Sequence, residues 1–256
     1  MKYLDVEPYQ RFSSYLSCSR EGQSLQCQLE SYSCKNAGSD RKKYSAFAKE
    51  NGHSPAELQA LSPPNEHGVS MSFASGSYPR GSICSEDLQI TDRKTIYYLM
   101  STLNSSFPDY DFTEANSQQF SRVQNVASVL NVVNTQLRES IGEEYAHLQT
   151  ALWAAIDQEI KLDDCEIYSY SYVDENDPFG ETGVMWSFNY LFYNKGLKRI
   201  TMFYCRASSM VALEDAYMTM GSADQSHLTP QSSFTMPMTT SSIQNNQNMV
   251  FDDWED

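Results

Sequence analysis

The stretch 186–205 (WSFNYLFYNKGLKRITMFYC) constrains the fold more than any other part of the 256-residue chain. From Trp186 to Phe192 every second residue is aromatic, as in a β-strand that buries one face. Asn194-Lys195-Gly196 has the composition of a turn, and apolar alternation resumes at Ile200. The pattern predicts a β-hairpin around which the rest of the fold is arranged.

The length of the hairpin loop follows from which residues must share a face. A three-residue loop places Tyr190 opposite Ile200 and gives one continuous apolar face, whereas a two-residue loop places Tyr190 opposite Thr201. Gly196 can adopt the left-handed conformation that the bulge of the longer loop requires. We therefore predict a three-residue loop.

Composition and periodicity divide the chain into four segments. Residues 1–50 are expected to form an N-terminal segment with a helix from Glu7 and a strand at Ser24–Cys34. Residues 91–206 are expected to form the main segment, in which helices over 92–162 precede strands. Residues 51–90, rich in Ser, Pro and Gly, predict a disordered regulatory linker, and 207–256 predict a disordered acidic tail.

The strand at Ser24–Cys34 cannot bury its apolar residues alone, so the N-terminal segment is expected to dock onto the main segment. The predicted fold class is α+β, a largely antiparallel β-sheet packed against helices that cover one face. The two segments would form a single, monomeric domain that a mobile insertion interrupts.

Charge and cysteine usage exclude several classes of function. The formal net charge is −15 and the isoelectric point is about 4.6, which argues against a broad nucleic-acid surface. Six cysteines form no CxxC pair and no Cys/His metal spacing, and Cys27 alternates with Leu25 and Leu29. We therefore expect buried structural thiols in a reducing compartment. The N-terminus lacks the apolar stretch of a signal peptide, and no membrane association is expected.

Catalysis has weak candidates. The sequence contains no Gly-rich phosphate loop, nucleophile elbow or zinc-protease motif. We therefore expect that the protein is not an enzyme and that it binds neither a cofactor nor a metal. Asp109, Asp111 and Glu114 would suit a carboxylate-dependent hydrolase, but Asp111 before Phe-Thr is also typical of a turn cap. Cys34 and His147 could form a nucleophilic pair, although nothing in the sequence brings them together.

The aromatic hairpin also allows a nucleic-acid-binding interpretation, because bases stack on aromatic strands that have basic residues nearby. Only Lys195, Lys198 and Arg199 lie near it, and an aromatic face on one side of a strand is usually core. We therefore expect the face to be core and expect no direct nucleic-acid binding.

Three segments together resemble a known family. They are ESYSCKNAGSDRKKY (30–44), RKTIYYLMSTLNSSFPDYDF (93–112) and WSFNYLFYNKGLKRI (186–200). Their order and spacing are similar to those of the eukaryotic Maf-type repressors of RNA polymerase III, which differ from the leucine-zipper and the nucleotide-hydrolysing Maf groups. Where that family commonly places a basic residue in NK-x-LKR, this chain has Gly196.

The resemblance implies a repressor that binds RNA polymerase III near its clamp and hinders engagement with the initiation factor that contains the TATA-binding protein. It also implies movement between nucleus and cytoplasm, and restraint by TOR-pathway kinases that phosphorylate the linker. Ser62 in ALSPP is the first phosphorylation candidate, and Ser54 and Ser45 follow.

The resemblance and the charge pattern give two further sets of candidate residues. Candidates for nuclear import are Arg41, Lys42, Lys43, Lys198 and Arg199. Candidates for the polymerase interface are Lys35, Asp40, Asp109, Asp111, Lys198 and Arg199.

Overall fold

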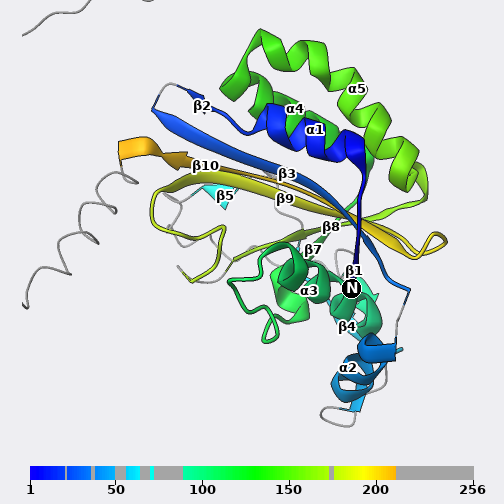
Figure 1. The fold of residues 1–256 in the computed structure, drawn as a ribbon. Helices are drawn as coiled ribbons and strands as arrows, with labels where there is room; N and C mark the ends of the chain where they lie inside the picture. The colour runs from blue at the N-terminus through cyan, green and yellow to red at the C-terminus, as the bar shows by residue number, and fades with distance from the viewer. Residues whose placement is uncertain are drawn as a thin grey trace, which may run out of the picture.

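The computed structural model describes residues 1–20, 22–35, 38–49, 56–63, 70–71, 89–172 and 176–211 (Figure 1). The helices are α1 (Glu7–Leu16), α2 (Gly38–Lys49), α3 (Arg93–Ser106), α4 (Val126–Ile141) and α5 (Glu143–Ile160). The strands are β1 (Lys2–Leu4), β2 (Ser19–Arg20), β3 (Gln23–Ser33), β4 (Leu58–Ala60), β5 (Ser70–Met71), β6 (Ile90–Asp92), β7 (Phe120–Val123), β8 (Glu166–Tyr170), β9 (Val184–Asn194) and β10 (Arg199–Ser209).

The main sheet has the order β1-β3-β10-β9-β8-β7, and all of these neighbours are antiparallel. Strand β3 of the N-terminal segment pairs with β10 of the main segment along its full length, from Arg199 opposite Ser33 to Ser209 opposite Gln23. The two segments therefore share one sheet, and the predicted α+β class with a largely antiparallel sheet is confirmed.

The hairpin of β9 and β10 forms as predicted, but its predicted loop length is wrong. Asn194 pairs with Arg199, which leaves the four residues 195–198 in the turn, and Tyr190 lies opposite Phe203 instead of Ile200. The left-handed residue of the turn is Lys198, with φ 54°, and not Gly196.

Helices cover both faces of the sheet, so the expectation that they cover one face is also wrong. Helices α1, α4 and α5 lie on one face, where they bury β9 residues such as Trp186, Phe188 and Tyr190 (Figure 1). Helix α3 lies on the other face and packs against Leu191 and Tyr193, which point the opposite way from the same strand. The sheet is thus the middle of three layers.

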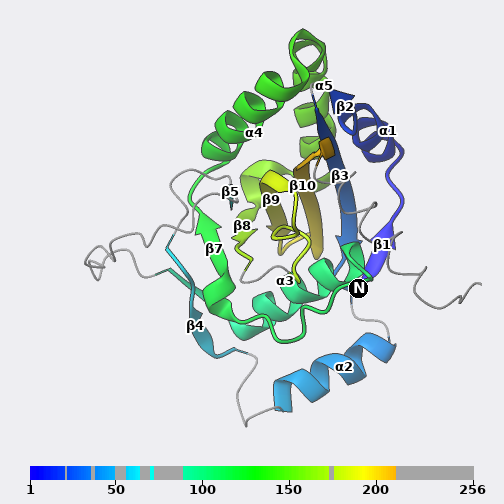
Figure 2. The ribbon, with the colours of Figure 1, turned by 90° about the vertical axis from the view of Figure 1, so that its left-hand side faces the viewer.

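The long helices follow their apolar stripes. Val129, Val133 and Leu137 of α4 are fully buried, and Gly142, with φ 80°, allows the sharp turn into α5. Helix α2 lies apart from the sheet and beyond α3 (Figure 2). It contacts α3 through aromatic rings, because Tyr97 packs against both Tyr44 and Phe47.

Parts of the predicted linker and tail belong to the fold. Leu58–Ala60 pairs with β6, and Ser70–Met71 pairs with β9, so these parts of 51–90 differ from the expected disorder. Strand β10 continues to Ser209, three residues beyond the predicted tail boundary. The structure does not describe residues 51–55, 64–69, 72–88 and 212–256.

Two cysteines that were expected to be free thiols form a disulfide. Cys27 of β3 lies directly opposite Cys205 of β10, with 4.0 Å between their Cα atoms, and both side chains are fully buried. The pairing register brings them together, which no spacing in the sequence indicates. Cys18, Cys34 and Cys165 form no disulfide within the described part of the chain.

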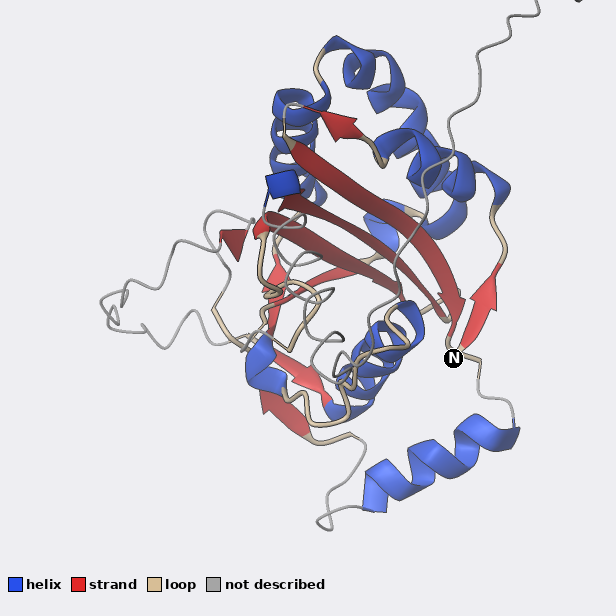
Figure 3. Cartoon of the chain, turned by 60° about the vertical axis from the view of Figure 1, so that its left-hand side comes forward, coloured by secondary structure: helices blue, strands red, loops and turns tan. Residues whose placement is uncertain are grey.

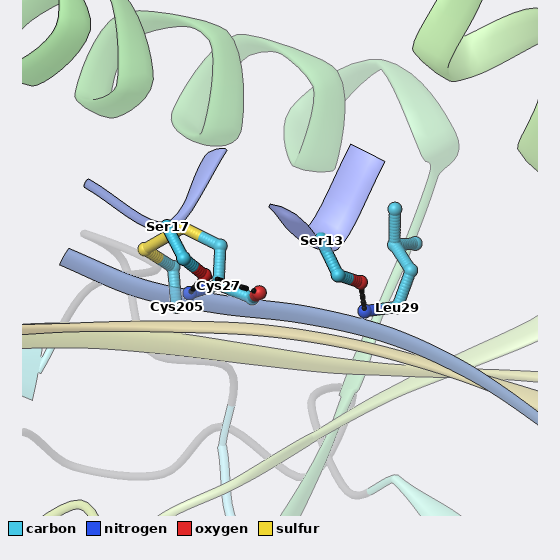
Figure 4. The surroundings of a disulfide bond; sticks show 5 residues. All are labelled: Ser13, Ser17, Cys27, Leu29 and Cys205. Carbon is cyan, nitrogen blue, oxygen red and sulfur yellow. Dashed lines mark hydrogen bonds between the residues drawn. A yellow bond between two sulfur atoms is a disulfide. The ribbon is translucent and has the colours of Figure 1, made fainter. Parts of the chain in front are cut away.

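Ser13 of α1 and Ser17, the residue that caps the C-terminus of this helix, cover the free edge of β3 beside the disulfide (Figure 4). The Ser17 hydroxyl accepts from the Cys27 N–H and donates to the Cys27 carbonyl, both at 3.0 Å. The Ser13 hydroxyl accepts from the Leu29 N–H at 2.9 Å. Ser13 and Ser17 thus satisfy backbone groups of β3 that a neighbouring strand would otherwise pair with. Figure 3 shows helices beside the long strands of this sheet.

Replacing Ser13 with alanine is expected to destabilise the fold by about 1–3 kcal/mol, because the buried Leu29 N–H loses its acceptor. Urea denaturation measures this loss. The control is Ser14→Ala, one position along the same helix, where the side chain is exposed and the change should be nearly neutral. Equal stability of the two variants would contradict the role of Ser13.

Candidate functional site

The three segments that carry the resemblance meet at one pocket of about 480 Å³. The end of β3, the start of α3 and the β9–β10 turn each supply part of its wall. The lining residues are Cys34 and Lys35 from the first segment, Lys94, Thr95 and Tyr98 from the second, Tyr193, Lys195 and Lys198 from the third, and Asp92. We call this cavity the lysine pocket.

Backbone contacts hold the walls of the lysine pocket in place. The Cys34 N–H donates to the Lys198 carbonyl at 2.8 Å, which fixes the β9–β10 turn against the end of β3. The Asn194 side chain shapes the turn from within, since its Oδ1 accepts from the Leu197 N–H and its Nδ2 donates to the Ile160 carbonyl, both at 2.9 Å. The side chains of Lys35 and Lys198 are therefore presented together.

A carboxylate caps the helix that forms the second wall. Asp92 Oδ1 accepts from the Thr95 N–H at 2.7 Å and from the Thr95 hydroxyl at 3.1 Å. This is an N-cap in which the side chain satisfies a free amide of the first turn of α3. The cap fixes the direction in which Lys94 and Tyr98 leave the helix.

The pocket carries more positive than negative charge. Lys195 Nζ is 2.9 Å from Glu166 Oε2 and 3.8 Å from Asp92 Oδ2. Burial raises the pKa of Glu166, but hydrogen bonds from Lys195 and the Tyr168 hydroxyl together lower it below its ordinary value. Lys35, Lys94 and Lys198 form no ion pair within the described parts of the chain.

Cys34 is a structural thiol. It is 4% exposed, and burial raises its pKa to about 12 although the amino terminus and Lys94 act in the opposite direction. A thiol that stays protonated at neutral pH is a poor nucleophile. His147 lies on α5, which covers the other face of the sheet, so the structure does not bring the imagined Cys34–His147 pair together.

The carboxylates suggested for a hydrolase lie in the exposed loop after α3. Asp111 Oδ1 accepts from the Thr113 N–H at 2.9 Å and from its hydroxyl at 2.7 Å, and these bonds lower the Asp111 pKa. Asp111 and Glu114 line a second pocket of about 540 Å³. A general acid near neutral pH needs a raised pKa, so the capping role fits Asp111 better.

The aromatic face of the hairpin is core, as expected. Trp186, Phe188 and Tyr190 are 8%, 1% and 2% exposed beneath the helices. Bases cannot stack on rings that the protein already covers, so this face does not support nucleic-acid binding.

The structure brings together two of the six residues predicted for the polymerase interface, Lys35 and Lys198. Arg199 instead pairs with the half-buried Glu159 at 2.7 Å and supports α5 against the sheet. Asp109 lies in the loop after α3 with Asp111, and the side chain of Asp40 lies outside the described residues.

The candidates for modification and import are distributed as follows. Ser62 forms a β-bridge with Ser121, its N–H donates to the Phe120 carbonyl at 2.9 Å, and its hydroxyl donates to the Gln118 carbonyl. Ser45 is half-buried on α2, and Ser54 lies outside the described residues. Lys42 and Lys43 are exposed on α2, whereas the Arg41 side chain is outside the described part.

Lys94, Tyr98 and Tyr193 belong to the site but were not predicted from the sequence. Lys94 and Tyr98 lie four positions apart on one face of α3, and both belong to the second segment. Lys94 could have been identified because it is a basic residue of the second segment that lies next to the end of a strand. Nothing in the sequence around Tyr193 indicated a functional site, because its apolar neighbours predict only a strand buried in the core.

Among the residues that the structure describes, no group of three or more His, Cys, Asp or Glu side chains could hold a metal ion. None of the helices in that part of the chain is long and apolar enough to cross a membrane.

Comparisons with known proteins agree on one family. A family model described as the Maf1 regulator matches residues 25–204, a range that contains all three segments. The repressor of RNA polymerase III transcription from Dictyostelium discoideum is 36% identical over 253 residues, covering 83% of this chain and 87% of that protein. The corresponding Schizosaccharomyces pombe repressor, maf1, is 30% identical over 200 residues, covering 78% and 80%. A crystal structure of citrus MAF1 matches with TM-score 0.55 and 26% identity over 80% of this chain and 98% of that one.

Proposed function

The chain belongs to the Maf1 regulator family, and from this premise we propose that it represses transcription by RNA polymerase III. In this proposal it binds the polymerase near its clamp and hinders engagement with the initiation factor that contains the TATA-binding protein. It acts by binding alone, without catalysis or a cofactor, and as a monomer. The observation that carries the contact is the convergence of the three family-like segments at the lysine pocket.

We propose Lys35 and Lys198 as the centre of the polymerase contact. They are exposed and held side by side by the hydrogen bond between Cys34 and Lys198. Exposed lysines on a strongly acidic protein favour an acidic partner surface and steer its approach. Asp40, Asp109 and Asp111 stay predicted members of the interface, while the ion pair with Glu159 makes Arg199 a weaker candidate.

The test of this function uses purified RNA polymerase III and the unphosphorylated full-length chain. The chain is expected to bind the polymerase in a pull-down and to inhibit transcription that depends on the promoter and the initiation factor. Prior assembly of the polymerase with that factor should reduce inhibition. Absence of both association and inhibition would contradict the proposal.

We further propose that phosphorylation of Ser62 by a TOR-pathway kinase restrains repression. The hydroxyl of Ser62 is used in a hydrogen bond to the Gln118 carbonyl, within a bridge to the sheet. A phosphate would remove this donor and add a charge of about −1.5 to −2 beside a carbonyl oxygen, which favours release of the bridge. Ser54 and Ser45 stay as secondary candidates.

The variant Ser62→Asp is expected to weaken inhibition of transcription several-fold, whereas Ser62→Ala should resist regulation by the kinase. Dose–response curves in the transcription assay measure the first effect, and hydrogen exchange of residues 58–62 measures opening of the bridge. Ser14→Asp on exposed α1 adds the same charge elsewhere and should change neither. Unchanged exchange in Ser62→Asp would argue against the bridge as the switch.

Movement between nucleus and cytoplasm is part of the same proposal. Its import candidates stay Arg41, Lys42, Lys43, Lys198 and Arg199, of which Lys42 and Lys43 are exposed on α2. Fluorescent fusions carrying Lys42→Gln and Lys43→Gln should lose nuclear enrichment if α2 carries the import signal. Unaltered distribution would exclude that role.

A further inference from the structure

We infer that the lysine pocket binds a phosphate monoester of the kind that phosphoserine carries on a protein segment. Two independent features of the pocket support this ligand. Within the described residues, one is a set of lysine ammonium groups without acidic partners, and the other is the hydroxyl of a largely buried tyrosine that has no hydrogen-bond partner.

The charges in the pocket are unbalanced. Lys35, Lys94 and Lys198 line it, and no carboxylate of the described chain forms an ion pair with them. Asp92, the acid among the described lining residues, already caps α3 and is 3.8 Å from the ammonium group of Lys195. Like charges gathered around one cavity repel each other, and an anion between them removes that repulsion. A chain with net charge −15 that nonetheless concentrates lysines here favours an anionic ligand.

The hydroxyl of Tyr193 supplies a donor in the same cavity. Tyr193 is 7% exposed and lines the pocket, and its hydroxyl forms no hydrogen bond with the described residues. Burial raises its pKa, so it keeps its proton at neutral pH. A hydroxyl that lines the same cavity as the lysines and donates to no protein group is available to an oxygen of a bound ligand.

The residue types favour phosphate over carboxylate. Among the described residues, four lysines and no arginine line the pocket, while neighbouring Arg93 lies over the Phe47 ring and Arg199 pairs with Glu159. Carboxylates are typically held by the fork of arginine, whereas lysine binds phosphate as a point charge. A phosphate monoester carries about −1.5 to −2 charges and three acceptor oxygens. It therefore balances three ammonium groups better than a single carboxylate does.

The shape of the pocket favours a phosphate that is attached to a protein segment. Its volume of about 480 Å³ lies within the roughly 300–1,000 Å³ of ordinary ligand pockets. The rings of Tyr98 and Tyr193, with centroids 6.0 Å apart, give the wall an apolar part. Lys94 Nζ lies 5.8 Å from the centre of the Tyr98 ring, at the border between the apolar and the basic parts. A phosphorylated side chain and its backbone can use both parts, whereas a free anion uses only the ammonium groups.

The test measures binding to the unphosphorylated full-length chain without polymerase, so its result is independent of the proposed repression. Isothermal titration calorimetry at low salt uses inorganic phosphate and three capped tripeptides, Ala-phosphoserine-Ala, Ala-Ser-Ala and Ala-Glu-Ala. We expect the phosphopeptide to bind more tightly than inorganic phosphate, the other two peptides not to bind, and affinity to fall as salt rises. No binding of the phosphopeptide, or equal binding of the glutamate peptide, would overturn the inference. Inorganic phosphate that binds as tightly as the phosphopeptide would overturn the protein-borne ligand.

Variants locate the binding. Lys94→Gln with Lys198→Gln should weaken phosphopeptide binding about 100-fold, since a charged hydrogen bond contributes on the order of tenfold. Tyr193→Phe removes only the hydroxyl and should weaken it several-fold without lowering the melting temperature. Arg11→Gln with Arg138→Gln removes the same charge from exposed positions of α1 and α4 and should leave binding unchanged. Equal losses in the two double variants would show non-specific attraction and overturn the inference, and wild-type affinity in Tyr193→Phe would overturn the role of the hydroxyl.

Discussion

Replacing Phe203 with alanine is expected to lower the free energy of unfolding by about 3–5 kcal/mol, as for a fully buried aromatic side chain. Phe203 lies at the middle of β10, between β3 and β9, and is not exposed at all. Its ring centre is 5.3 Å from that of Phe188 on β9 and 6.2 Å from that of Trp153 on α5. Its loss leaves a cavity where the sheet meets the layer of α1, α4 and α5, so the surrounding side chains cannot fill the space unless α5 moves.

Urea denaturation followed by circular dichroism measures this change. Leu197→Ala is the control, because Leu197 lies in the β9–β10 turn with 36% of its surface exposed. Its loss should be about 0.5 kcal/mol or less. A loss below about 1 kcal/mol for Phe203→Ala would contradict the central position of β10.

The elements of the fold were largely predictable from the sequence. The apolar stripe of α4 and the alternation in β3 predicted both elements closely, because each buries a continuous face. The covering of both sheet faces was not predictable from the aromatic alternation alone. Leu191 and Tyr193 lie between the aromatic positions of β9, and the sequence does not show whether a second layer covers them.

The apolar residues on both faces of the hairpin also explain why the predicted loop length is wrong. The three-residue loop was predicted so that Ile200 would share a face with Tyr190, as it would in a sheet with one apolar face. In the structure both faces are apolar, so Ile200 pairs with Tyr193 and Phe203 pairs with Tyr190. When every register buries apolar residues, alternation no longer selects one of them. The turn then decides the register, and here Asn194 closes it by accepting from Leu197.

The site was predictable only in part. The resemblance of the three segments pointed to Lys35 and Lys198, and the structure places both in one pocket. Neither charge nor periodicity could show that β3, α3 and the β9–β10 turn meet at one end of the sheet. That meeting depends on β3 pairing with β10, where Cys27 lies opposite Cys205 at a sequence separation of 178, which only the fold reveals.

Reversing the charge of the pocket is expected to have the largest effect on function. Lys35→Glu with Lys198→Glu should weaken binding to RNA polymerase III by at least about 30-fold, since losing a partner of an interfacial charge pair costs about 2–5 kcal/mol. Both side chains are exposed, so the fold should keep its melting temperature. Inhibition of promoter-dependent transcription should be lost in parallel.

The most direct test of the polymerase contact is the affinity of purified RNA polymerase III for this double variant, measured beside Arg11→Glu with Arg138→Glu. The control applies the same charge reversal to exposed positions of α1 and α4, on the opposite helical layer. If the lysine pocket is the contact, the control binds as the wild type does and the pocket variant loses at least about 30-fold. Wild-type affinity in the pocket variant, or the same loss of affinity in both variants, would contradict the lysine pocket as the polymerase contact.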